Sequence, residues 1–536
     1  MTAAIRARAE TDPHGIALAD DSGTRTWAEV ADDLERAAGA LLAVAPEPAQ
    51  RVSVIGDNAI PTLEAHAAAL TVGVGTVATS RQLRASELAD QYADAGVVCA
   101  ITGPGSLPAV QEAAAQAALR TIVTHGTSTP AGTSTPAGTS TPAGTGTPAG
   151  TGAADGVLPW ADWLRSAPPV PPDAGQRPPR PLLVYTSGTT GRARGAEVRW
   201  TVTLPRTAAE YVAAITAESA FPPGPHLVVG PMQHNAPLTS VRHLLAGQPV
   251  IILGRFDAEA ILRLIAEHGV TSSVMVPTHF QRLLTLPAEV RDRYDVSSLR
   301  LVSQTGSACP ADTKLAMINW FGPILTESYG GSESGTLCRI DSTEWLAHRG
   351  SVGRPRAPYE VAVLDEQGQE QAAGQVGVLG FRAPEGRGPS YHADPEKTKK
   401  AYIAPGVFTL GDVGYVDEDG YVYITDRIAD MVVSGGVNLY PAESEKVLVT
   451  HPAVAEVAVI GVPHPDLGES LLALVVPAGD PPDAAGLQAW CRDHLAPYKV
   501  PRAYEFRTEL IYNAMGKPDK KAMRAPYWSS ERTIAG

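Results

Sequence analysis

The 536-residue chain has few cysteines, no excess of positive charge and no long apolar run. Its four cysteines lie far apart without a CxxC pair, so buried or incidental thiols in a reducing cytosol are expected. The formal charge of -14 argues against a surface that binds duplex nucleic acid. The N-terminal stretch MTAAIRARAETDPHG has charges where a signal peptide needs an apolar core, and no run is long enough for a membrane span. We therefore expect a soluble, cytoplasmic protein with no nucleic-acid partner.

The length and the order of apolar runs predict an α/β fold with more than one domain. Short β-branched runs alternate with helical patterns, as in DAEAILRLIAEHG, where Asp257 is the expected N-cap and Gly269 the expected C-terminal stop. This alternation is typical of parallel sheets with helical covers. We expect a large N-terminal domain over residues 1–427, built of parallel-rich sheets. A small, mobile α+β domain is expected over residues 428–536.

One low-complexity segment interrupts this pattern. Between Thr127 and Gly152 a six-residue repeat of Thr, Pro, Ala and Gly cannot bury a core. We expect a disordered surface loop at about residues 124–156 inside the large domain, with a domain boundary as the second interpretation. Padding without a function is favoured over a functional role for the repeat.

The stretch Leu182–Val198, LLVYTSGTTGRARGAEV, breaks from an apolar run into hydroxyls, glycines and arginines. Hydroxyl groups, closely approaching glycine backbone and fixed positive charge all suit phosphate oxygens. The residues that offer them are Ser187, Thr189, Thr190, Gly188, Gly191, Gly195, Arg192 and Arg194. The pattern indicates a polyphosphate site, whereas a flexible glycine-rich turn is the alternative for this cluster alone. It is not a Walker A loop, because GxxxxGK[ST] is absent.

The full string resembles the phosphate loop of the adenylate-forming superfamily, which includes acyl-CoA synthetases, adenylation domains of nonribosomal peptide synthetases and luciferase. Its closest resemblance is to the acyl-CoA synthetase branch, and five motifs follow in the family's order. The resemblance implies that ATP phosphates are bound at Thr186, Ser187, Gly188, Thr189, Thr190 and Gly191. Arg194 stands where the family usually has lysine, which keeps the charge and implies a catalytic role.

Two further motifs imply an adenine site and a metal ligand. In ESYGGSESG the resemblance has Tyr329 stack on adenine, with Gly330 beside it, Ser332 near the α-phosphate and Glu333 as a catalytic ligand of Mg²⁺. A magnesium ion that bridges phosphates usually takes only one or two protein carboxylates. The segment TGSACP resembles the family's lining of the adenine and acyl pockets, through Gly306, Ser307 and Ala308. Taken singly, Glu333 would be read as an exposed loop acid.

The remaining motifs imply a ribose site, a catalytic lysine and a thiol channel. Asp412 in FTLGDVGYVDEDGYVYITDR would accept from the ribose hydroxyls, and Arg427 would reach the same sugar. Without the neighbouring motifs, a hairpin aspartate and a surface arginine would be the preferred interpretation. Lys517 in YNAMGKPDKKAMR matches the family's catalytic lysine, which stabilises charge as pyrophosphate leaves. Gly435 lies in a glycine-containing segment that resembles the border of the pantetheine tunnel.

The chain departs from the family pattern at the hinge and in the acyl pocket. Ala429 stands where many members have a charged hinge residue. His234, in PMQHNAP, and Gly331 are expected in the substrate pocket, where the histidine packs or donates to a polar group. The aspartate that α-amino-acid adenylation domains use near His234 is absent, which argues against an α-amino acid substrate.

The resemblance implies an AMP-forming acid–thiol ligase that uses ATP, Mg²⁺ and CoA. Its first step would join a carboxylic acid to ATP as an acyl-adenylate, and its second would transfer the acyl group to CoA. Three alternatives stay open at this point: loading of a separate carrier protein, ATP-dependent diazotisation of an aryl amine with nitrite, and a nucleotide-binding relic without activity. A homodimer is common among similar ligases, so it is a possible assembly here.

Overall fold

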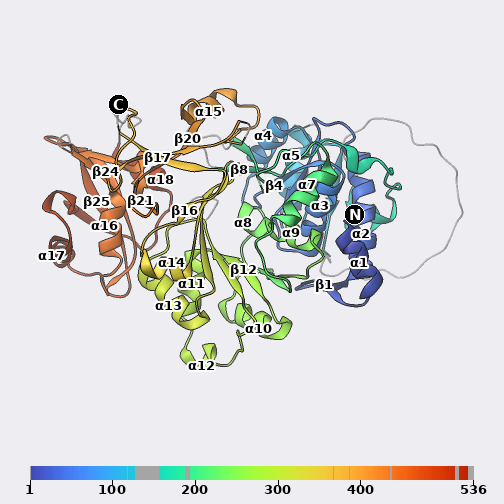
Figure 1. Cartoon of the computed structure of the whole chain (residues 1–536), viewed down its shortest axis with the longest axis horizontal. Coiled ribbons are helices and arrows are strands. Elements are labelled where there is room, and N and C mark those ends of the chain that lie inside the picture. The colour runs from blue at the N-terminus through green and yellow to red at the C-terminus, as the bar shows by residue number, and fades with distance from the viewer. Residues whose placement is uncertain are drawn as a thin grey trace, which may run out of the picture. The chain divides into compact units, whose positions relative to one another are not determined.

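The computed structural model describes residues 2–117, 119–126, 156–186, 194–198, 200–365, 367–385, 387–434, 437–512 and 518–528 (Figure 1). The chain divides into two compact units. Unit 1 comprises Met1–Met275, Arg282–Val302 and Ser390–Pro395. Unit 2 comprises Val276–Gln281, Ser303–Pro389 and Glu396–Gly536. The expected domain limits, 1–427 and 428–536, stay a prediction, and the repeat Thr127–Gly152 lies outside the described residues.

Unit 1 contains a seven-stranded sheet in the order β7-β6-β5-β3-β4-β8-β9, parallel except for the last pair. Every residue of the three central strands is buried, as expected for a parallel sheet that is covered on both faces. The strands are β3 (Arg51–Ile55), β4 (Gly75–Thr79), β5 (Val97–Thr102), β6 (Thr121–Thr124), β7 (Val157–Pro159), β8 (Leu183–Thr186) and β9 (Arg194–Glu197). Helices that follow these strands include α3 (Ile60–Thr71), α4 (Ala85–Ala95), α5 (Leu107–Gln116) and α6 (Trp160–Arg165).

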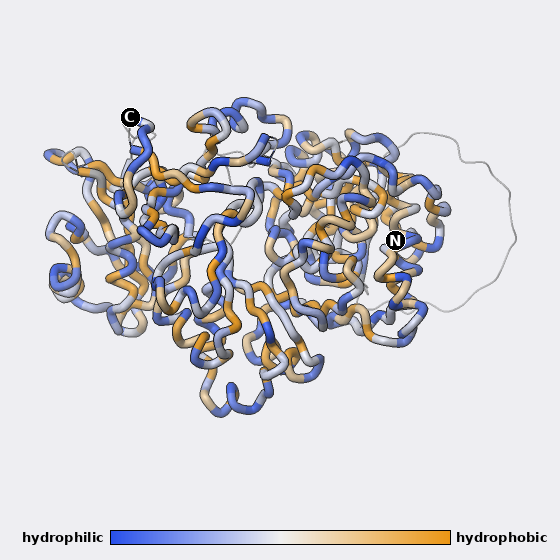
Figure 2. The backbone as a smooth tube through the Cα atoms, in the orientation of Figure 1, coloured by the Kyte–Doolittle hydropathy of each residue, from blue (hydrophilic) through white to orange (hydrophobic). Residues whose placement is uncertain are grey.

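Five further strands of unit 1 lie side by side in the order β12-β10-β11-β1-β2. They are β1 (Ile16–Asp20), β2 (Gly23–Thr26), β10 (His226–Val228), β11 (Val250–Ile252) and β12 (Ser272–Met275). The accompanying helices are α1 (Ala3–Thr11), α2 (Trp27–Val44), α7 (Ala208–Ala217), α8 (Asn235–Leu238), α9 (Ser240–Leu245) and α10 (Ala258–His268). Hydrophobic and hydrophilic positions interchange along α2 in Figure 2, as expected for a helix with one buried face.

The predicted ends of α10 are confirmed. The side chain of Asp257 accepts a hydrogen bond from the Ala260 N–H, and Gly269 adopts the left-handed conformation with φ +59°. Before the repeat, short apolar runs form the strands β3 and β5, with α3 between them in the sequence. Local sequence signals therefore place these elements correctly, because caps and apolar runs act over a few residues.

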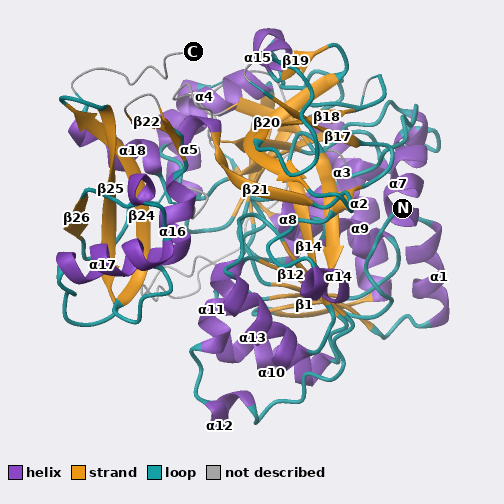
Figure 3. Cartoon of the chain, turned by 60° about the vertical axis from the view of Figure 1, so that its left-hand side comes forward, coloured by secondary structure: helices purple, strands orange, loops and turns teal. Residues whose placement is uncertain are grey.

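Unit 2 contains two five-stranded sheets, of which the first is antiparallel and the second lies near the C-terminus (Figure 3). The first has the order β17-β18-β20-β19, with β21 also paired to β20. The second has the order β23-β22-β25-β24, with β26 paired to β25. The bounds are β17 (Glu360–Leu364), β18 (Gly377–Arg382), β19 (Tyr402–Ala404), β20 (Val407–Val416), β21 (Val422–Arg427), β22 (Val432–Ser434), β23 (Val437–Leu439), β24 (Val454–His464), β25 (Gly468–Pro477) and β26 (Ala503–Phe506).

The other elements of unit 2 include three neighbouring strands and the C-terminal helices. The strands are β14 (Leu325–Gly331), β15 (Gly335–Asp341) and β16 (Arg354–Pro355), and β13 (Leu301–Gln304) runs across the limit of the two units. The helices are α13 (Ala311–Phe321), α14 (Ser342–Ala347), α15 (Pro395–Lys400), α16 (Pro441–Leu448), α17 (Ala484–His494) and α18 (Lys520–Arg524). No helix in the described ranges is long and apolar enough to cross a membrane. The predicted α/β class, with a large sheet-rich part and a small C-terminal part, is confirmed.

Candidate active site

Three of the predicted nucleotide-binding side chains meet in unit 2. The hydroxyl of Tyr329 donates to Oδ2 of Asp412 at 2.6 Å, and Nε of Arg427 donates to Oδ1 of the same carboxylate at 3.2 Å. Asp412 is only 4% exposed, whereas the side chain of Arg427 is 63% exposed. The cluster Tyr329–Asp412–Arg427 therefore presents a buried anion, with an aromatic ring on one side and an accessible cation on the other.

The register of two strands brings the carboxylate and the arginine together. β20 and β21 are antiparallel, and Asp412 lies directly opposite Arg427. Directly opposite residues in such a ladder have neighbouring side chains, which lets an acid and a base pair across the strands. Tyr329 reaches the same carboxylate from β14, 83 positions earlier in the chain. Sequence motifs predicted all three residues, and the structure adds that they form one hydrogen-bonded group.

The electrostatics of the cluster keep Tyr329 as a donor. Burial raises the pKa of its phenol, and the negative charge of Asp412 raises it further. A tyrosine that keeps its proton at neutral pH donates to a carboxylate instead of competing with it. Asp412 thus has one acceptor oxygen engaged by a neutral donor and the other by a guanidinium, which fixes the orientation of the carboxylate.

The predicted metal ligand lies at the end of the β14–β15 hairpin. A Cβ on Gly330 would lie 1.9 Å from the Gly335 carbonyl oxygen, so only glycine fits the close strand approach there. A Cβ on Gly331 would come within 2.8 Å of Oε2 of Glu333, which places that half-buried carboxylate against the glycine. The hydroxyl of Ser334 accepts from the Gly331 N–H at 2.9 Å and closes the turn around Ser332. Glycines therefore let Glu333 fold back toward the strand end.

The chemistry of Glu333 fits a magnesium ion that is held mainly by phosphate oxygens and water. Such an ion takes only one or two protein carboxylates. Among the residues that the structure describes, no group of three or more His, Cys, Asp or Glu could hold a metal ion. Glu333 would supply one such carboxylate.

The predicted adenine-lining segment follows β13 and is bonded to β14. The hydroxyl of Thr305 donates to the Ser328 carbonyl at 3.0 Å, beside Tyr329, and Nε2 of Gln304 donates to the Ser307 carbonyl at 2.9 Å. Gly306 has φ +93°, a conformation that side-chain-bearing residues rarely adopt. The surfaces of Gly306, Ser307 and Ala308 stay exposed.

A buried ion pair between α13 and β14 was not predicted from the sequence. Nζ of Lys314, on α13, lies 2.6 Å from Oε2 of Glu327, on β14, and 4.6 Å from the Trp345 ring centroid. Lys314 is 1% exposed and Glu327 is 7% exposed. Burial raises the pKa of Glu327, and Lys314 opposes this rise. An isolated lysine in an apolar helix such as ADTKLAMINWF was the only available signal, because its partner lies in another element.

In unit 1 the predicted phosphate loop joins the adjacent strands β8 and β9. Thr186 and Arg194 lie directly opposite each other in this antiparallel pair. Ser187, Gly188, Thr189, Thr190 and Gly191 lie outside the described residues. Tyr185, in β8, donates through its hydroxyl to Oδ2 of Asp94, in α4, at 2.5 Å, which ties the hairpin to that helix.

The predicted pocket histidine stands at the start of a short helix in unit 1. His234 precedes α8 and is half-buried, and its Nε2 lies 3.4 Å from the amide nitrogen of Gln233. The next residue, Asn235, accepts a hydrogen bond from the Trp200 indole at 2.7 Å. These contacts fix the MQHN segment, and they place His234 in a polar setting.

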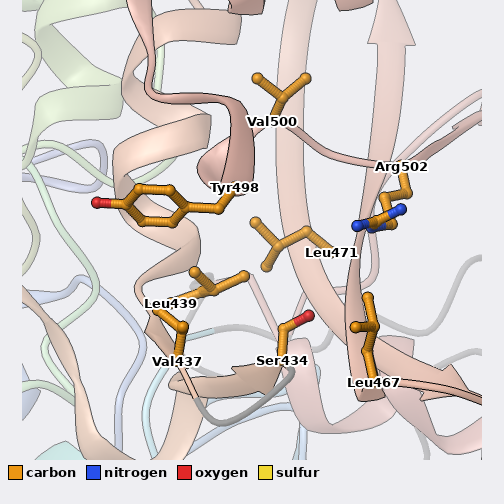
Figure 4. Close-up of a pocket in the computed structure, with 8 residues that line it drawn as sticks. All are labelled: Ser434, Val437, Leu439, Leu467, Leu471, Tyr498, Val500 and Arg502. Carbon is orange, nitrogen blue, oxygen red and sulfur yellow. The ribbon is translucent and has the colours of Figure 1, made fainter.

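A pocket of about 200 Å³ lies in the C-terminal part of unit 2 (Figure 4). Figure 4 shows apolar side chains from β23 and β25 together, with Arg502 at one side and Tyr498 at the other. Ser434 lines it and directly precedes the predicted thiol-channel residue Gly435, which lies outside the described residues, as does Lys517. The full lining is Ser434, Val437, Leu439, Leu467, Leu471, Tyr498, Val500 and Arg502.

Comparison with known proteins assigns the chain to a family. The model of the AMP-binding enzymes matches residues 5–389, and that of the AMP-binding enzyme C-terminal domain matches residues 443–517. A medium/long-chain-fatty-acid–CoA ligase of Mycobacterium tuberculosis is 33% identical over 69% of this chain, which spans 65% of that protein. A feruloyl-CoA synthase of an Amycolatopsis species is 32% identical, over 96% of this chain and 97% of the relative.

A solved structure supports the same assignment. The amide bond synthetase McbA of Marinactinospora thermotolerans superposes with a TM-score of 0.78 and 25% identity, over 98% of this chain and 100% of that one. The chain belongs to the AMP-binding enzyme family, in the acyl-CoA synthetase branch of the adenylate-forming superfamily. The predicted enzyme class, an AMP-forming acid–thiol ligase, and the predicted use of ATP and CoA are confirmed at the level of this family. The predicted Mg²⁺ stays a prediction.

Proposed function

We propose that the chain activates a carboxylic acid with ATP as an acyl-adenylate and then transfers the acyl group to the thiol of CoA, with release of pyrophosphate and AMP. The observation that carries this proposal is the cluster Tyr329–Asp412–Arg427. A buried carboxylate is the natural acceptor for the two hydroxyls of a ribose, and an aromatic ring beside it suits adenine.

The proposal gives each nucleotide-binding residue a role that its position supports. Tyr329 stacks on adenine, next to the exposed surface of Gly306, Ser307 and Ala308, and Asp412 with Arg427 holds the ribose. Gly330 leaves room at the strand end, and Ser332 contacts the α-phosphate. Thr186 and Arg194 flank the phosphate loop, with Ser187, Gly188, Thr189, Thr190 and Gly191 between them. Glu333 holds Mg²⁺, which neutralises phosphate charge when it is bound.

The acid and the acceptor thiol use other parts of the chain. His234 and Gly331 are each assigned to binding of the acid. Lys517 stabilises the negative charge that develops while pyrophosphate leaves. The thiol arm of CoA passes Gly435, and the pocket lined by Ser434 and Arg502 receives the acceptor. The cation of Arg502 suits the phosphates of CoA, which favours free CoA over a carrier protein.

An amine is a second candidate acceptor. It is favoured by the similarity to an amide bond synthetase, which extends over nearly the whole of both chains. In that case the adenylate forms in the same way, and an amine nitrogen attacks its carbonyl carbon with AMP as the leaving group. The two acceptors differ in the product bond, not in the first step.

All four cysteines are free, which is typical of a reducing compartment and supports a cytoplasmic location. Assembly as a homodimer stays a prediction from the family resemblance.

The test is release of AMP and pyrophosphate by the purified chain with MgATP and a panel of fatty, aryl and bile-type acids. Each acid is assayed with CoA, with a primary amine and without an acceptor, and nitrite is assayed in place of the acid. AMP that depends on one acid and increases with CoA supports the ligase. An increase with the amine alone supports amide synthesis, and AMP driven by nitrite without an acid contradicts both and supports diazotisation.

A further inference from the structure

The carboxylate of Asp426 connects two elements that lie apart in the sequence. It is the last residue but one of β21 and is 6% exposed. Its Oδ1 accepts from the Arg427 N–H at 2.7 Å, and its Oδ2 accepts from the Ala442 N–H at 2.9 Å. Ala442 lies in the first turn of α16, where backbone N–H groups have no partner within the helix. One side chain therefore fastens the end of β21 to the start of α16.

Helix α18 is fastened to the same region by two cations. Nζ of Lys520 lies 2.7 Å from Oε1 of Glu445, on α16. Nη1 of Arg524 donates to the Ala429 carbonyl and to Oδ1 of Asp430, each at 3.1 Å. Helix α18 thus binds the backbone of the expected hinge residue Ala429 and the carboxylate of the next residue, Asp430.

The charges around Asp426 form a balanced group. Burial acts to lower the pKa of Lys520, but Glu445, Asp430 and Asp426 together raise it, so the ammonium stays charged. Burial raises the pKa of Asp426 to about 6, although Lys520 and the two N–H groups oppose this. Asp426 is thus ionised at pH 7.5, where it accepts both hydrogen bonds.

This group is hydrogen-bonded to the nucleotide cluster and lies close in the sequence to the segments of Lys517 and Gly435. Arg427, whose N–H is held by Asp426, donates through its side chain to Asp412. α18 begins three positions after Lys517, and α16 begins six positions after Gly435. Asp426 therefore connects the nucleotide cluster to α16, close in the sequence to the two segments that carry Gly435 and Lys517.

We propose that Asp426 is a positioning residue that couples the nucleotide cluster to α16 and α18 and thereby favours one of the two proposed steps over the other. The proposal rests on the two-step reaction above. The contact of Asp426 with Ala442 spans the expected hinge residue Ala429, with the nucleotide cluster before it in the sequence and α16 and α18 after it. The first step is proposed to use Lys517, three positions before α18, and the second to use the segment at Gly435, six positions before α16.

The test compares the two half-reactions in Asp426→Asn and the unchanged full-length chain. Asparagine has the same shape but only one acceptor oxygen, so it can satisfy one of the two N–H groups and carries no charge toward Lys520. Acid-dependent ATP–pyrophosphate exchange reports the first step, and single-turnover consumption of preformed acyl-adenylate with CoA reports the second. We expect one rate to fall about tenfold and the other to stay within about twofold, the size of a lost hydrogen bond to a charged group.

Glu456→Gln is the matched control, because it also replaces a carboxylate by an amide in the C-terminal part of unit 2. Glu456, on β24, is exposed and accepts from the Tyr512 hydroxyl at 2.8 Å. It should leave both rates within about twofold, since exposed pairs contribute little. An equal fall of both rates in Asp426→Asn, or no change in either, would contradict the positioning role. An unchanged chain that forms no adenylate with any acid would instead contradict the proposed function, and this role with it.

A second readout uses pH. The charged groups that act on Asp426 are Lys520 on α18 and Glu445 on α16, and Asp430 in the following turn acts on Lys520. The next residue, Arg427, donates its N–H to Asp426 and its side chain to Asp412. Protonation of Asp426 below about pH 6 should have the same effect as its replacement by asparagine. The ratio of the two half-reaction rates should therefore change between pH 7.5 and 5.5 in the unchanged chain but not in Asp426→Asn. The same change in Asp426→Asn would show that another group titrates and would overturn the proposal.

Discussion

A single buried carboxylate organises the nucleotide cluster. Asp412 accepts from a tyrosine hydroxyl and from a guanidinium, and neither donor lies next to it in the sequence. Burial of a charged group is costly unless hydrogen bonds replace the lost water, and here both oxygens have such partners. Loss of the Asp412 carboxylate would therefore remove both hydrogen bonds of the cluster at once.

Replacement of Asp412 by asparagine should weaken nucleotide binding. The amide keeps the shape but loses the charge opposite Arg427 and one acceptor oxygen. We expect the KM for ATP in the exchange assay to rise about 10- to 100-fold, which corresponds to about 1.5–3 kcal/mol for a hydrogen bond to a charged group. Glu370→Gln, which alters an exposed ion pair with Arg382 in the same unit, is the control. An unchanged KM for ATP in Asp412→Asn would remove the cluster from the nucleotide site.

The predicted catalytic lysine gives a second prediction about a single side chain. Lys517→Ala should slow adenylation by about 10²–10³, by analogy with the loss of one oxyanion donor. Lys521→Ala removes an exposed lysine four positions later and should change the rate by less than about twofold. The measurement is pyrophosphate exchange at saturating ATP and acid. Near wild-type exchange by Lys517→Ala would refute its catalytic role.

Helix α13 and strand β14 are joined by the buried pair Lys314–Glu327. Glu327 lies two residues before Tyr329, and the Trp345 ring is a further partner for the cation of Lys314. The two charges of the pair are held at 2.6 Å in a nearly dry setting, where each depends on the other. The register of β14, and with it the position of Tyr329, is therefore supported from the side that faces α13.

Removal of one partner should destabilise unit 2 strongly. Glu327→Leu leaves Lys314 buried without its counter-charge, and we expect a loss of about 3–5 kcal/mol in the free energy of unfolding. The double variant Lys314→Met, Glu327→Leu should recover much of this loss, because it removes the uncompensated charge. Urea unfolding followed by tryptophan fluorescence measures both. A double variant no more stable than Glu327→Leu would show that packing, not charge, governs the site.

Buried histidines make the stability of unit 1 depend on pH. His66, on α3, is fully buried with Nδ1 at 2.9 Å from the Thr76 hydroxyl, and burial lowers its pKa to about 3. Because the unfolded chain takes up this proton near pH 6.5 and the folded chain does not, the free energy of unfolding falls as the pH falls from about 6.5 toward 3. The slope is about 1.4 kcal/mol per pH unit for each such group.

The measurement is the urea midpoint at pH 7.5 and at pH 5.5. His66→Gln keeps a hydrogen-bonding group toward Thr76 but does not titrate, so its midpoint should shift less between the two pH values. A parallel shift in both proteins would assign the pH dependence to other groups, such as His226, whose pKa is also lowered by burial.

The repeat between β6 and β7 gives a prediction about the whole chain. The two strands are parallel neighbours, with Thr124 opposite Pro159. Deletion of two of the six-residue units shortens the connection, and this should change the free energy of unfolding by less than about 1 kcal/mol, because loop closure depends only logarithmically on length. Adenylation should stay within about twofold. A large loss of exchange activity would show that the repeat has a function and is not padding.

Much of the fold could be predicted because its signals are local. The caps of α10 at Asp257 and Gly269 and the strands on either side of the repeat follow from patterns of a few residues. The candidate site was predicted through motifs, and three of its residues prove to be in contact. Lys314, Glu327 and Asp426 were not predicted, since each depends on a partner in a distant element.

The sequence alone determined the family, because the motif order and residue types identify it without coordinates. It also determined most element types, which depend on local backbone preference and apolar spacing. The tertiary structure decided how these residues are held. Strand register sets Asp412 opposite Arg427, packing buries Lys314 against Glu327, and the start of α16 satisfies Asp426. These contacts join residues far apart in the chain, and their free energies depend on burial, which no local pattern contains.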